Sequence, residues 1–360
     1  MRGYRTALDV EFAPGAMCAL VGEAGTGKST LLAAVRSLLE PSPLTGRPHA
    51  VAGRPAGPAR VDGRLARGES IWVDCDGRRG GAATAVVPEL VHMPADRRAG
   101  DVVSPTARPG PAHGHITRAL ASGSRPAAGA STTASAVALV RAVESAGAAA
   151  VRGAVLLIEE PELYLRPQAQ RYLYRLLRTL AAAGNQVIYS THAPAFLNVG
   201  RLEELVLVGY DPATGMRLRQ PQPFAEEGDF RTLVEFDSER SELFLARSAL
   251  LVEGMTEKLA FPFVFAALGH DPDREAISII ACGGKSNIPL FARVCSAVGV
   301  PFVVVHDRDA PAGRRPIAAE RVVNRRIAEV AGGGRTVVLT PDFEGVAGLS
   351  GRSHKPERAW

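Results

Sequence analysis

Nine residues near the start of the sequence, Gly22 to Thr30, have the types and spacing of a phosphate-binding loop. They read Gly-Glu-Ala-Gly-Thr-Gly-Lys-Ser-Thr and satisfy the pattern G-x-x-x-x-G-K-[ST]. Such glycines let backbone N–H groups curl around phosphates, while the lysine reaches the β- and γ-phosphates of ATP and the serine ligates Mg²⁺. The residues predicted to bind the nucleotide are Gly22, Gly25, Gly27, Lys28, Ser29 and Thr30.

Two adjacent carboxylates follow the apolar run 154–158, which predicts a buried strand. Ligands bind at the carboxyl edge of open α/β sheets, where such residues lie. We expect Glu159 to hold Mg²⁺ through water and Glu160 to orient or deprotonate the attacking water. Acidic residues after a strand are also common helix caps, so the pairing with the phosphate loop is what favours catalysis. His192, after the next predicted strand, is either a sensor of the γ-phosphate or a structural histidine.

A second group of carboxylates lies in the C-terminal part of the chain. Glu253 ends a predicted strand, and Glu257 falls in the first turn of the helix after it. Asp307 and Asp309 follow a later strand, and their spacing puts both side chains on one face if the extended conformation persists. Four converging carboxylates suit Mg²⁺ or Mn²⁺, and two such ions about 4 Å apart would activate water for phosphodiester cleavage. The alternative for an Asp-x-Asp after a strand is a loop cap.

The segments that must position these residues alternate between strands and helices, which predicts a mainly parallel α/β sheet. Apolar runs predict strands at 17–21, 154–158 and 186–190, and helical spacing predicts helices at 29–39, 134–146 and 168–183. A second α/β unit has predicted strands at 249–252, 276–280 and 301–305. The stretches 41–67 and 95–133 are rich in Pro, Gly, Ala and Arg, which indicates a low-complexity insertion at about 41–133.

Composition sets the class of protein. With 360 residues and 46% hydrophobic content the chain is long enough for about two globular domains. No apolar run approaches the ~20 residues of a membrane-spanning helix. Because the four cysteines are scattered and the first residues do not resemble a secretion signal, we expect a cytoplasmic location. A net charge of +5 permits binding to nucleic acid.

The order of phosphate loop, Glu-Glu and His matches ATP-binding cassette (ABC) ATPases. The wording Ile-Glu-Glu-Pro-Glu and Ser-Thr-His-Ala-Pro resembles the OLD (overcoming lysogenization defect) family of ATP-dependent endonucleases. Glu-Gly-x-x-Glu, Gly-Gly-Lys-Ser-Asn and Asp-x-Asp resemble the Toprim module of OLD nucleases. The resemblance implies an ABC-type P-loop ATPase domain at 1–235 followed by a Toprim, Rossmann-like α/β domain at 236–360.

The same resemblance implies further roles and partners. Two ATPase heads sandwich ATP in this family, so a homodimer or higher homo-oligomer is expected. DNA is the expected substrate, and a helicase is a possible partner. Glu344 is implied as another metal ligand and Lys355 as a catalytic cation. Only four lysines occur, and all lie in or beside motifs, as expected where a compact ammonium is needed. Lys258 and Lys285 are thus candidates to contact phosphate, or ordinary surface lysines.

The sequence departs from the family before its Glu-Glu motif. The best match to the glycine-and-glutamine signature segment is the stretch 129–133, where Ser131 and Thr133 are weak substitutes. No glutamine loop is evident, and Arg166 stands where a histidine is common. Nucleotide binding is therefore better supported than rapid hydrolysis.

Three functions compete. The first is an ATP-controlled, metal-dependent DNA endonuclease used in phage defence or DNA repair. The second is a DNA-binding ATPase clamp without nuclease activity, against which the intact set of four carboxylates argues. The third is a Toprim topoisomerase or primase, disfavoured because the chain has neither a zinc-binding cysteine cluster nor room for a tyrosine-bearing cleavage domain.

Overall fold

The computed structural model divides the chain into two compact units, described separately below. Unit 1 comprises residues 1–196 and 203–220, and unit 2 comprises 197–202 and 221–360. The structure describes residues 10, 12, 17–40, 60–65, 68–74, 78–81, 88–93, 95, 152–163, 165–211, 215–222, 239–310 and 315–348. The predicted domain boundary between residues 235 and 236 lies outside the described residues, as does the helix predicted at 134–146.

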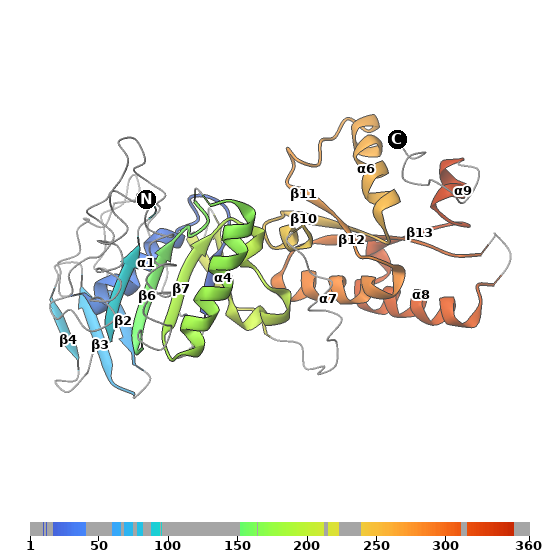
Figure 1. Ribbon diagram of the computed structural model, residues 1–360. Helices are drawn as coiled ribbons and strands as arrows, with labels where there is room; N and C mark the ends of the chain where they lie inside the picture. The colour runs from blue at the N-terminus through green and yellow to red at the C-terminus, as the bar shows by residue number, and fades with distance from the viewer. Residues whose placement is uncertain are drawn as a thin grey trace. The chain divides into compact units, whose positions relative to one another are not determined.

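The main sheet of unit 1 has the strand order β5-β6-β7-β1-β8-β9, of which Figure 1 labels β6 and β7. Its strands are parallel except for β9, which pairs antiparallel with β8. The strands are β1 (Met17–Val21), β5 (Glu89–Met93), β6 (Ala154–Glu159), β7 (Gln186–Thr191), β8 (Leu205–Asp211) and β9 (Gly215–Arg219). All five residues of β1 are buried because this strand is central and covered on both faces.

Two helices and two short 3₁₀ segments complete the main part of unit 1 as described. The helices are α1 (Lys28–Leu39) and α4 (Pro167–Ala182), and the 3₁₀ segments are η2 (Pro194–Phe196) and η3 (Val199–Glu204), the latter crossing the division between the units. Helix α4 buries one apolar stripe, made of Leu173, Leu177, Leu180 and Ala181, and exposes Arg171 and Arg175. The strands and helices predicted at 17–39 and 154–190 are thus confirmed to within one or two residues.

The described residues of the interval 41–133, which was expected to be a low-complexity insertion, include four strands. Three of them form an antiparallel sheet, β2 (Arg60–Arg64), β3 (Ser70–Asp74) and β4 (Arg79–Gly81), and the fourth is β5 of the main sheet. The expectation of loops at 60–64 was wrong. Strand β2 has one apolar residue, Val61, so the sequence gives no strand pattern there, and contacts with the neighbouring strand stabilise it. Arg60, for example, stacks on Trp72 with 4.4 Å between its guanidinium carbon and the ring centre.

The sheet of unit 2 has the order β11-β10-β12-β13, and all of its strands are parallel. The strands are β10 (Ser248–Val252), β11 (Ile277–Ala281), β12 (Phe302–Asp307) and β13 (Thr336–Leu339). The helical segments are α6 (Met255–Ala267), α7 (Ile288–Val298), α8 (Ala318–Ala331) and α9 (Phe343–Ala347), with 3₁₀ turns η4 (Arg240–Phe244), η5 (Lys285–Asn287) and η6 (Gly333–Arg335). Figure 1 shows α6 on one face of the sheet and α7 and α8 on the other.

The fold class predicted from the sequence is therefore observed as two mainly parallel α/β units in series. In parallel sheets the carboxyl ends of neighbouring strands meet at one edge, and the pairings of Glu159 with Ser190 and of Val21 with Thr191 bring three predicted site motifs together. Among the helices of the described ranges, none has the length and apolar character needed to span a bilayer.

Candidate nucleotide and metal sites

The phosphate loop joins β1 to α1, and its glycines are required by packing. A Cβ at Gly22 would collide with the carbonyl oxygen of Val208 on β8, and one at Gly27 would collide with the Met216 side chain on β9. Gly25, at φ 74°, is different, because a Cβ there would meet nothing within 4 Å. Close packing thus holds the loop backbone at Gly22 and Gly27, while the space beside Gly25 is unoccupied by protein atoms, as a phosphate-binding loop requires.

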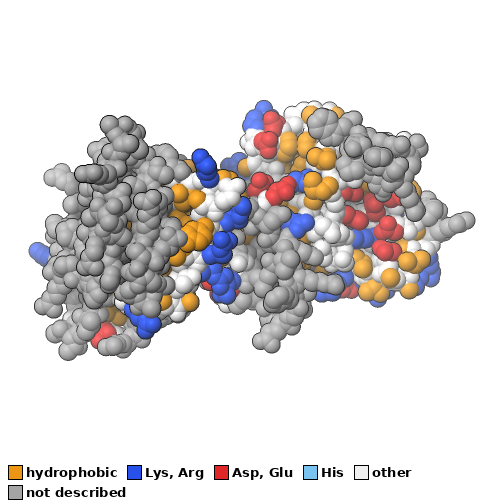
Figure 2. Space-filling model, in the orientation of Figure 1, with side chains coloured by type: hydrophobic (Ala, Val, Ile, Leu, Met, Phe, Trp, Pro, Cys, Tyr) orange, Lys and Arg blue, Asp and Glu red, His pale blue; other side chains and the backbone are white. Residues whose placement is uncertain are grey.

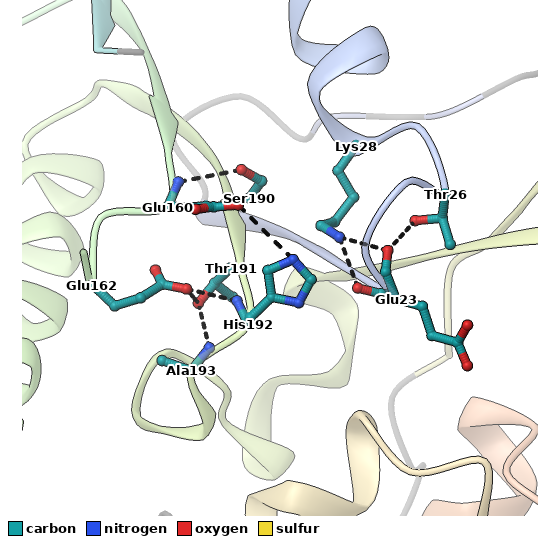
Figure 3. Close-up of polar contacts among 10 residues, drawn as sticks. Glu23, Thr26, Lys28, Glu160, Glu162, Ser190, Thr191, His192 and Ala193 are labelled. Atoms are coloured by element: carbon teal, nitrogen blue, oxygen red, sulfur yellow. Dashed lines mark hydrogen bonds and ion pairs between the residues drawn. The ribbon is translucent and has the colours of Figure 1, made fainter. Parts of the chain in front are cut away.

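The side chain of Lys28 lies over this loop. It is only 6% exposed, and its ammonium donates to the carbonyl oxygens of Gly22 at 2.7 Å and Glu23 at 2.9 Å (Figure 3). Burial lowers the pKa of Lys28, while the carboxylates of Glu160 and Glu162 act in the opposite direction. Lys28 therefore lies within the electrostatic field of Glu160 and Glu162. Ser29 is exposed and Thr30 half-buried at the start of α1.

The Glu-Glu pair ends strand β6, with each carboxylate facing a histidine. Glu159 Oε1 lies 3.5 Å from Nε2 of His92, a buried residue on β5. Glu160 Oε1 lies 3.9 Å from Nε2 of His192, so the two predicted catalytic residues are brought together (Figure 3). Glu160 has a left-handed backbone, φ 44°, and its N–H donates to the carbonyl oxygen of Ser190 at 3.0 Å.

Glu162 is a residue that the sequence analysis did not assign. Its Oε1 accepts hydrogen bonds from the Thr191 hydroxyl at 2.9 Å and from the His192 N–H at 2.6 Å, and the Thr191 hydroxyl oxygen accepts from the Ala193 N–H at 3.0 Å (Figure 3). Glu162 thus fixes the turn that carries His192. The available signal was its position as the third acid of Ile-Glu-Glu-Pro-Glu.

Unit 2 brings Glu253 and Asp307 together at adjacent strand ends. Glu253 Oε1 accepts from the Asp307 N–H at 2.7 Å, and Asp307 Oδ1 accepts from the Phe343 N–H at 2.8 Å, at the start of α9. Glu257 Oε2 accepts from the Gly254 N–H at 3.0 Å and so caps the first turn of α6. In Figure 2 acidic side chains gather on the visible face of unit 2, with basic side chains among them.

The pKa values of Glu253 and Asp307 reflect burial first and neighbouring carboxylates second. Burial raises the pKa of Glu253 to about 7, against the hydrogen bond from Asp307 and the charge of Lys285, which lower it. Burial and then the Glu253 carboxylate raise the pKa of Asp307 to about 7. Glu257 and Asp309 add to both shifts. Burial is thus the main cause of both shifts and repulsion among the carboxylates a smaller one, which a divalent cation would relieve.

Asp309 departs from the predicted arrangement. Strand β12 ends at Asp307, and Asp309 has a left-handed backbone with φ 59°, so the extended conformation does not persist and the expectation of one shared face was wrong. Its carboxylate forms an ion pair with Lys285, which also lies 3.3 Å from Glu320 Oε2. Within the described ranges, no three His, Cys, Asp or Glu side chains are placed to hold one metal ion as they stand.

The remaining predicted residues differ in outcome. Glu344 is half-buried in the first turn of α9, next to the Phe343 N–H that binds Asp307. Lys258 forms an ion pair with Glu239, and Arg166 is exposed before α4. Lys355 and the signature stretch 129–133 lie outside the described residues.

Two family models match the chain. The TOPRIM domain of overcoming lysogenization defect protein-like proteins matches residues 244–309, which include all four carboxylates of unit 2. An AAA ATPase domain matches residues 141–197, which include the Glu-Glu pair and His192. Each match thus falls on one of the two clusters described above.

Two similar proteins are named OLD nucleases. The OLD nuclease of Thermus scotoductus is 40% identical over 227 residues, which cover 56% of this chain and 42% of that protein. The Old nuclease of Escherichia phage P2 is 28% identical over 161 residues, which cover 43% of this chain and 28% of that protein. The chain therefore spans less than half the length of these two relatives.

Among solved structures, the C-terminal region of the Burkholderia pseudomallei OLD protein is 22% identical, with a TM-score of 0.25. The match covers 32% of this chain and 71% of that one. Taken with the two family models, the curated relatives confirm the predicted resemblance to the OLD family: an AAA-type ATPase domain followed by an OLD-like TOPRIM domain.

Proposed function

We propose that this protein is an ATP-binding, metal-dependent DNA endonuclease of the OLD type. The observation that carries the proposal is the Glu253–Asp307 pair, two half-buried carboxyl groups at adjacent strand ends. The Asp307 N–H donates to the Glu253 carboxylate, and burial raises the pKa of both groups to about 7, with the Glu253 carboxylate adding to the shift of Asp307. Crowded oxygen ligands at the ligand-binding edge of a parallel sheet are costly for a fold and useful to a metal site.

The nucleotide half follows from the phosphate loop. Lys28 would contact the β- and γ-phosphates, Ser29 and Glu159 would hold Mg²⁺, and Glu160 would orient the attacking water. His192, 3.9 Å from Glu160, would sense the γ-phosphate. Bound Mg²⁺ would neutralise charge on the phosphates.

The nuclease half uses the four acids of unit 2. Their oxygen donors suit Mg²⁺ or Mn²⁺. A bound cation would lower the raised pKa values of Glu253 and Asp307, because it stabilises the ionised carboxylates. We assign Glu253, Glu257, Asp307 and Asp309 as ligands, with Glu344 on α9 as a further one and Lys355 as a cation for the scissile phosphate. When bound, the metal would activate water and stabilise the leaving oxygen.

A DNA-binding ATPase clamp without nuclease activity is the second candidate. It is favoured by the ion pair that holds Asp309 on Lys285 and by the lack of a ready three-ligand cluster among the residues described. Because a clamp has no need of carboxyl groups that repel one another, the Glu253–Asp307 pair favours the nuclease.

The biological setting extends the same proposal. DNA is the proposed substrate, a choice consistent with the net charge of +5. ATP sandwiched between two heads would make the working form a homodimer or higher homo-oligomer in the cytoplasm. A helicase partner and a role in phage defence or DNA repair belong to this proposal as well.

The test is incubation of the purified chain with supercoiled plasmid, with and without Mn²⁺ or Mg²⁺ and with and without ATP. The proposal expects nicked or linear DNA only when a divalent metal is present, and a change in rate with ATP. ATP binding with intact plasmid in every metal condition would favour the clamp instead.

A further inference from the structure

Lys285 occupies a place that its predicted role as a phosphate contact does not explain. Its side chain is only 8% exposed, and its ammonium lies between two carboxylates that belong to different elements. One is Asp309, after β12, and the other is Glu320, in the first turn of α8. A buried ammonium held by two acids is already neutralised, so it is poorly placed to attract phosphate.

The backbone around Lys285 fixes it beside the metal site. The Gly284 N–H donates to the carbonyl oxygen of Glu253 at 2.8 Å, which ties the Lys285 turn to the strand end that carries a predicted metal ligand. Gly284 has a φ of 133°, a conformation that glycine adopts readily. The ammonium is close enough to act on the pKa of Glu253. Lys285 is therefore part of the acidic centre.

The two acids around Lys285 are not equivalent. Asp309 is 39% exposed and is a predicted metal ligand, and its left-handed backbone turns its carboxylate to Lys285. Glu320 Oε2 lies 3.3 Å from the same ammonium. Because the lysine stem is flexible, a small movement would transfer the ammonium from one acid to the other without exposing a buried charge.

From this geometry we infer that Lys285 is a tethered cation that competes with a divalent ion for Asp309, and that Glu320 receives the ammonium when the ion binds. Lys285 and Glu320 are thus positioning residues that set the metal affinity of the centre. The inference rests on the proposed metal site and adds its regulation. It explains why the Asp309 carboxylate is turned to an ammonium in the metal-free chain.

The inference predicts opposite effects for the two partners. Lys285→Met removes the competitor and should tighten Mn²⁺ binding at least about threefold. Glu320→Gln removes the alternative partner, so the ammonium stays on Asp309 and Mn²⁺ should bind at least about threefold more weakly. In a Lys285→Met background Glu320→Gln should have a clearly smaller effect, because there is no ammonium left to receive.

The Lys258–Glu239 ion pair supplies the matched control. It also joins a lysine and a glutamate of unit 2. Lys258→Met and Glu239→Gln make the same charge changes without touching Asp309. They report the general effect of charge on Mn²⁺ binding, which should be smaller than that of the Lys285 and Glu320 changes.

The experiment is calorimetric titration of the full chain with Mn²⁺ alone, without ATP or DNA, using Asp307→Asn to define heat unrelated to this site. The inference expects tighter binding in Lys285→Met, weaker binding in Glu320→Gln and loss of the Glu320 effect in the double variant. Should Lys285→Met not fold, Lys285→Gln, which keeps a donor to Asp309, takes its place.

Two failures are distinguishable. If the wild-type chain binds Mn²⁺ and the Lys285 and Glu320 variants bind it with the same affinity, the inference is overturned but the proposed metal site is not. A wild-type chain that gives no more heat than Asp307→Asn would overturn the metal site, and this inference with it.

Discussion

The two units each bury one lysine at the carboxyl edge of a parallel sheet, but they satisfy it differently. Lys28 donates to two neutral loop carbonyls, with the acids Glu160 and Glu162 nearby but bonded elsewhere. Lys285 is paired with two carboxylates. A lysine that donates to neutral carbonyls can still attract an incoming phosphate. A lysine paired with carboxylates is already neutralised by them and in turn reduces the repulsion within an acidic centre.

The comparison predicts that the two centres fail independently. The largest effect is expected for Glu253→Ala, which removes one of the paired carboxyl groups and should abolish metal-dependent nicking of plasmid. Nucleotide affinity should not change, because the phosphate loop lies in the other unit. Calorimetry with a non-hydrolysable ATP analogue, beside a gel assay of nicking, checks both halves. Residual nicking at the wild-type rate would remove the nuclease assignment.

Lys28→Ala should weaken binding of the ATP analogue at least about tenfold, because a charge-assisted hydrogen bond contributes ~1.5–3 kcal/mol. Lys285→Ala is the matched control, since it deletes the other buried lysine and should leave nucleotide affinity unchanged. The same titration measures both. Equal losses in the two variants would contradict the distinction between the lysines.

Lys355→Ala should slow nicking at least about tenfold, a cautious value for a group that stabilises charge on the transferred phosphate. Lys355→Arg should restore only part of the rate because its planar head cannot occupy the same point. Binding of DNA and ATP should stay normal. Normal nicking by the alanine variant would leave the carboxylates and their metals to carry the chemistry alone.

Glu162→Ala should lower kcat for ATP hydrolysis by about fivefold, the size of one net hydrogen bond, with little change in KM. The reason is that Glu162 accepts a hydrogen bond from the His192 N–H and so holds the turn that carries this residue. Glu162→Gln, which can still accept both hydrogen bonds, should restore most of the rate. If Glu162→Ala changes KM and leaves kcat intact, Glu162 belongs to binding.

The smallest effect concerns stability. The folded-state pKa values of Glu253 and Asp307 are raised to about 7, so the folded chain binds protons that the unfolded chain has lost. The free energy of unfolding of the metal-free protein should therefore fall as pH rises from about 4 to above 7. Asp307→Asn should recover on the order of 1 kcal/mol at pH 8 and little at pH 5.

Thermal unfolding at both pH values, without metal, measures this difference. A rise in Tm of about 2–4 °C for Asp307→Asn at pH 8 is expected. An equal rise at pH 5 would show that ionisation of the buried Asp307 carboxyl group is not the cause.

Prediction from sequence succeeded where one strong pattern acted alone. The apolar strand 154–158 and the loop from Gly22 are local signals, and the structure has both. Strand β2, with a single apolar residue, and the edge strand β13 depend on partners that the sequence does not show. The same holds for the sites: Glu253 and Asp307 were predicted from strand ends, while Glu162, Glu320 and the turn of Asp309 depend on contacts between distant segments.

The most direct test of the central claim is the nicking rate of Asp307→Ala in Mn²⁺ and ATP, measured beside wild type on the same supercoiled plasmid. We predict rapid nicking by wild type and none by the variant, although the variant binds the ATP analogue with unchanged affinity. Equal nicking by both proteins, or none by either, would contradict a metal nuclease centred on Glu253 and Asp307.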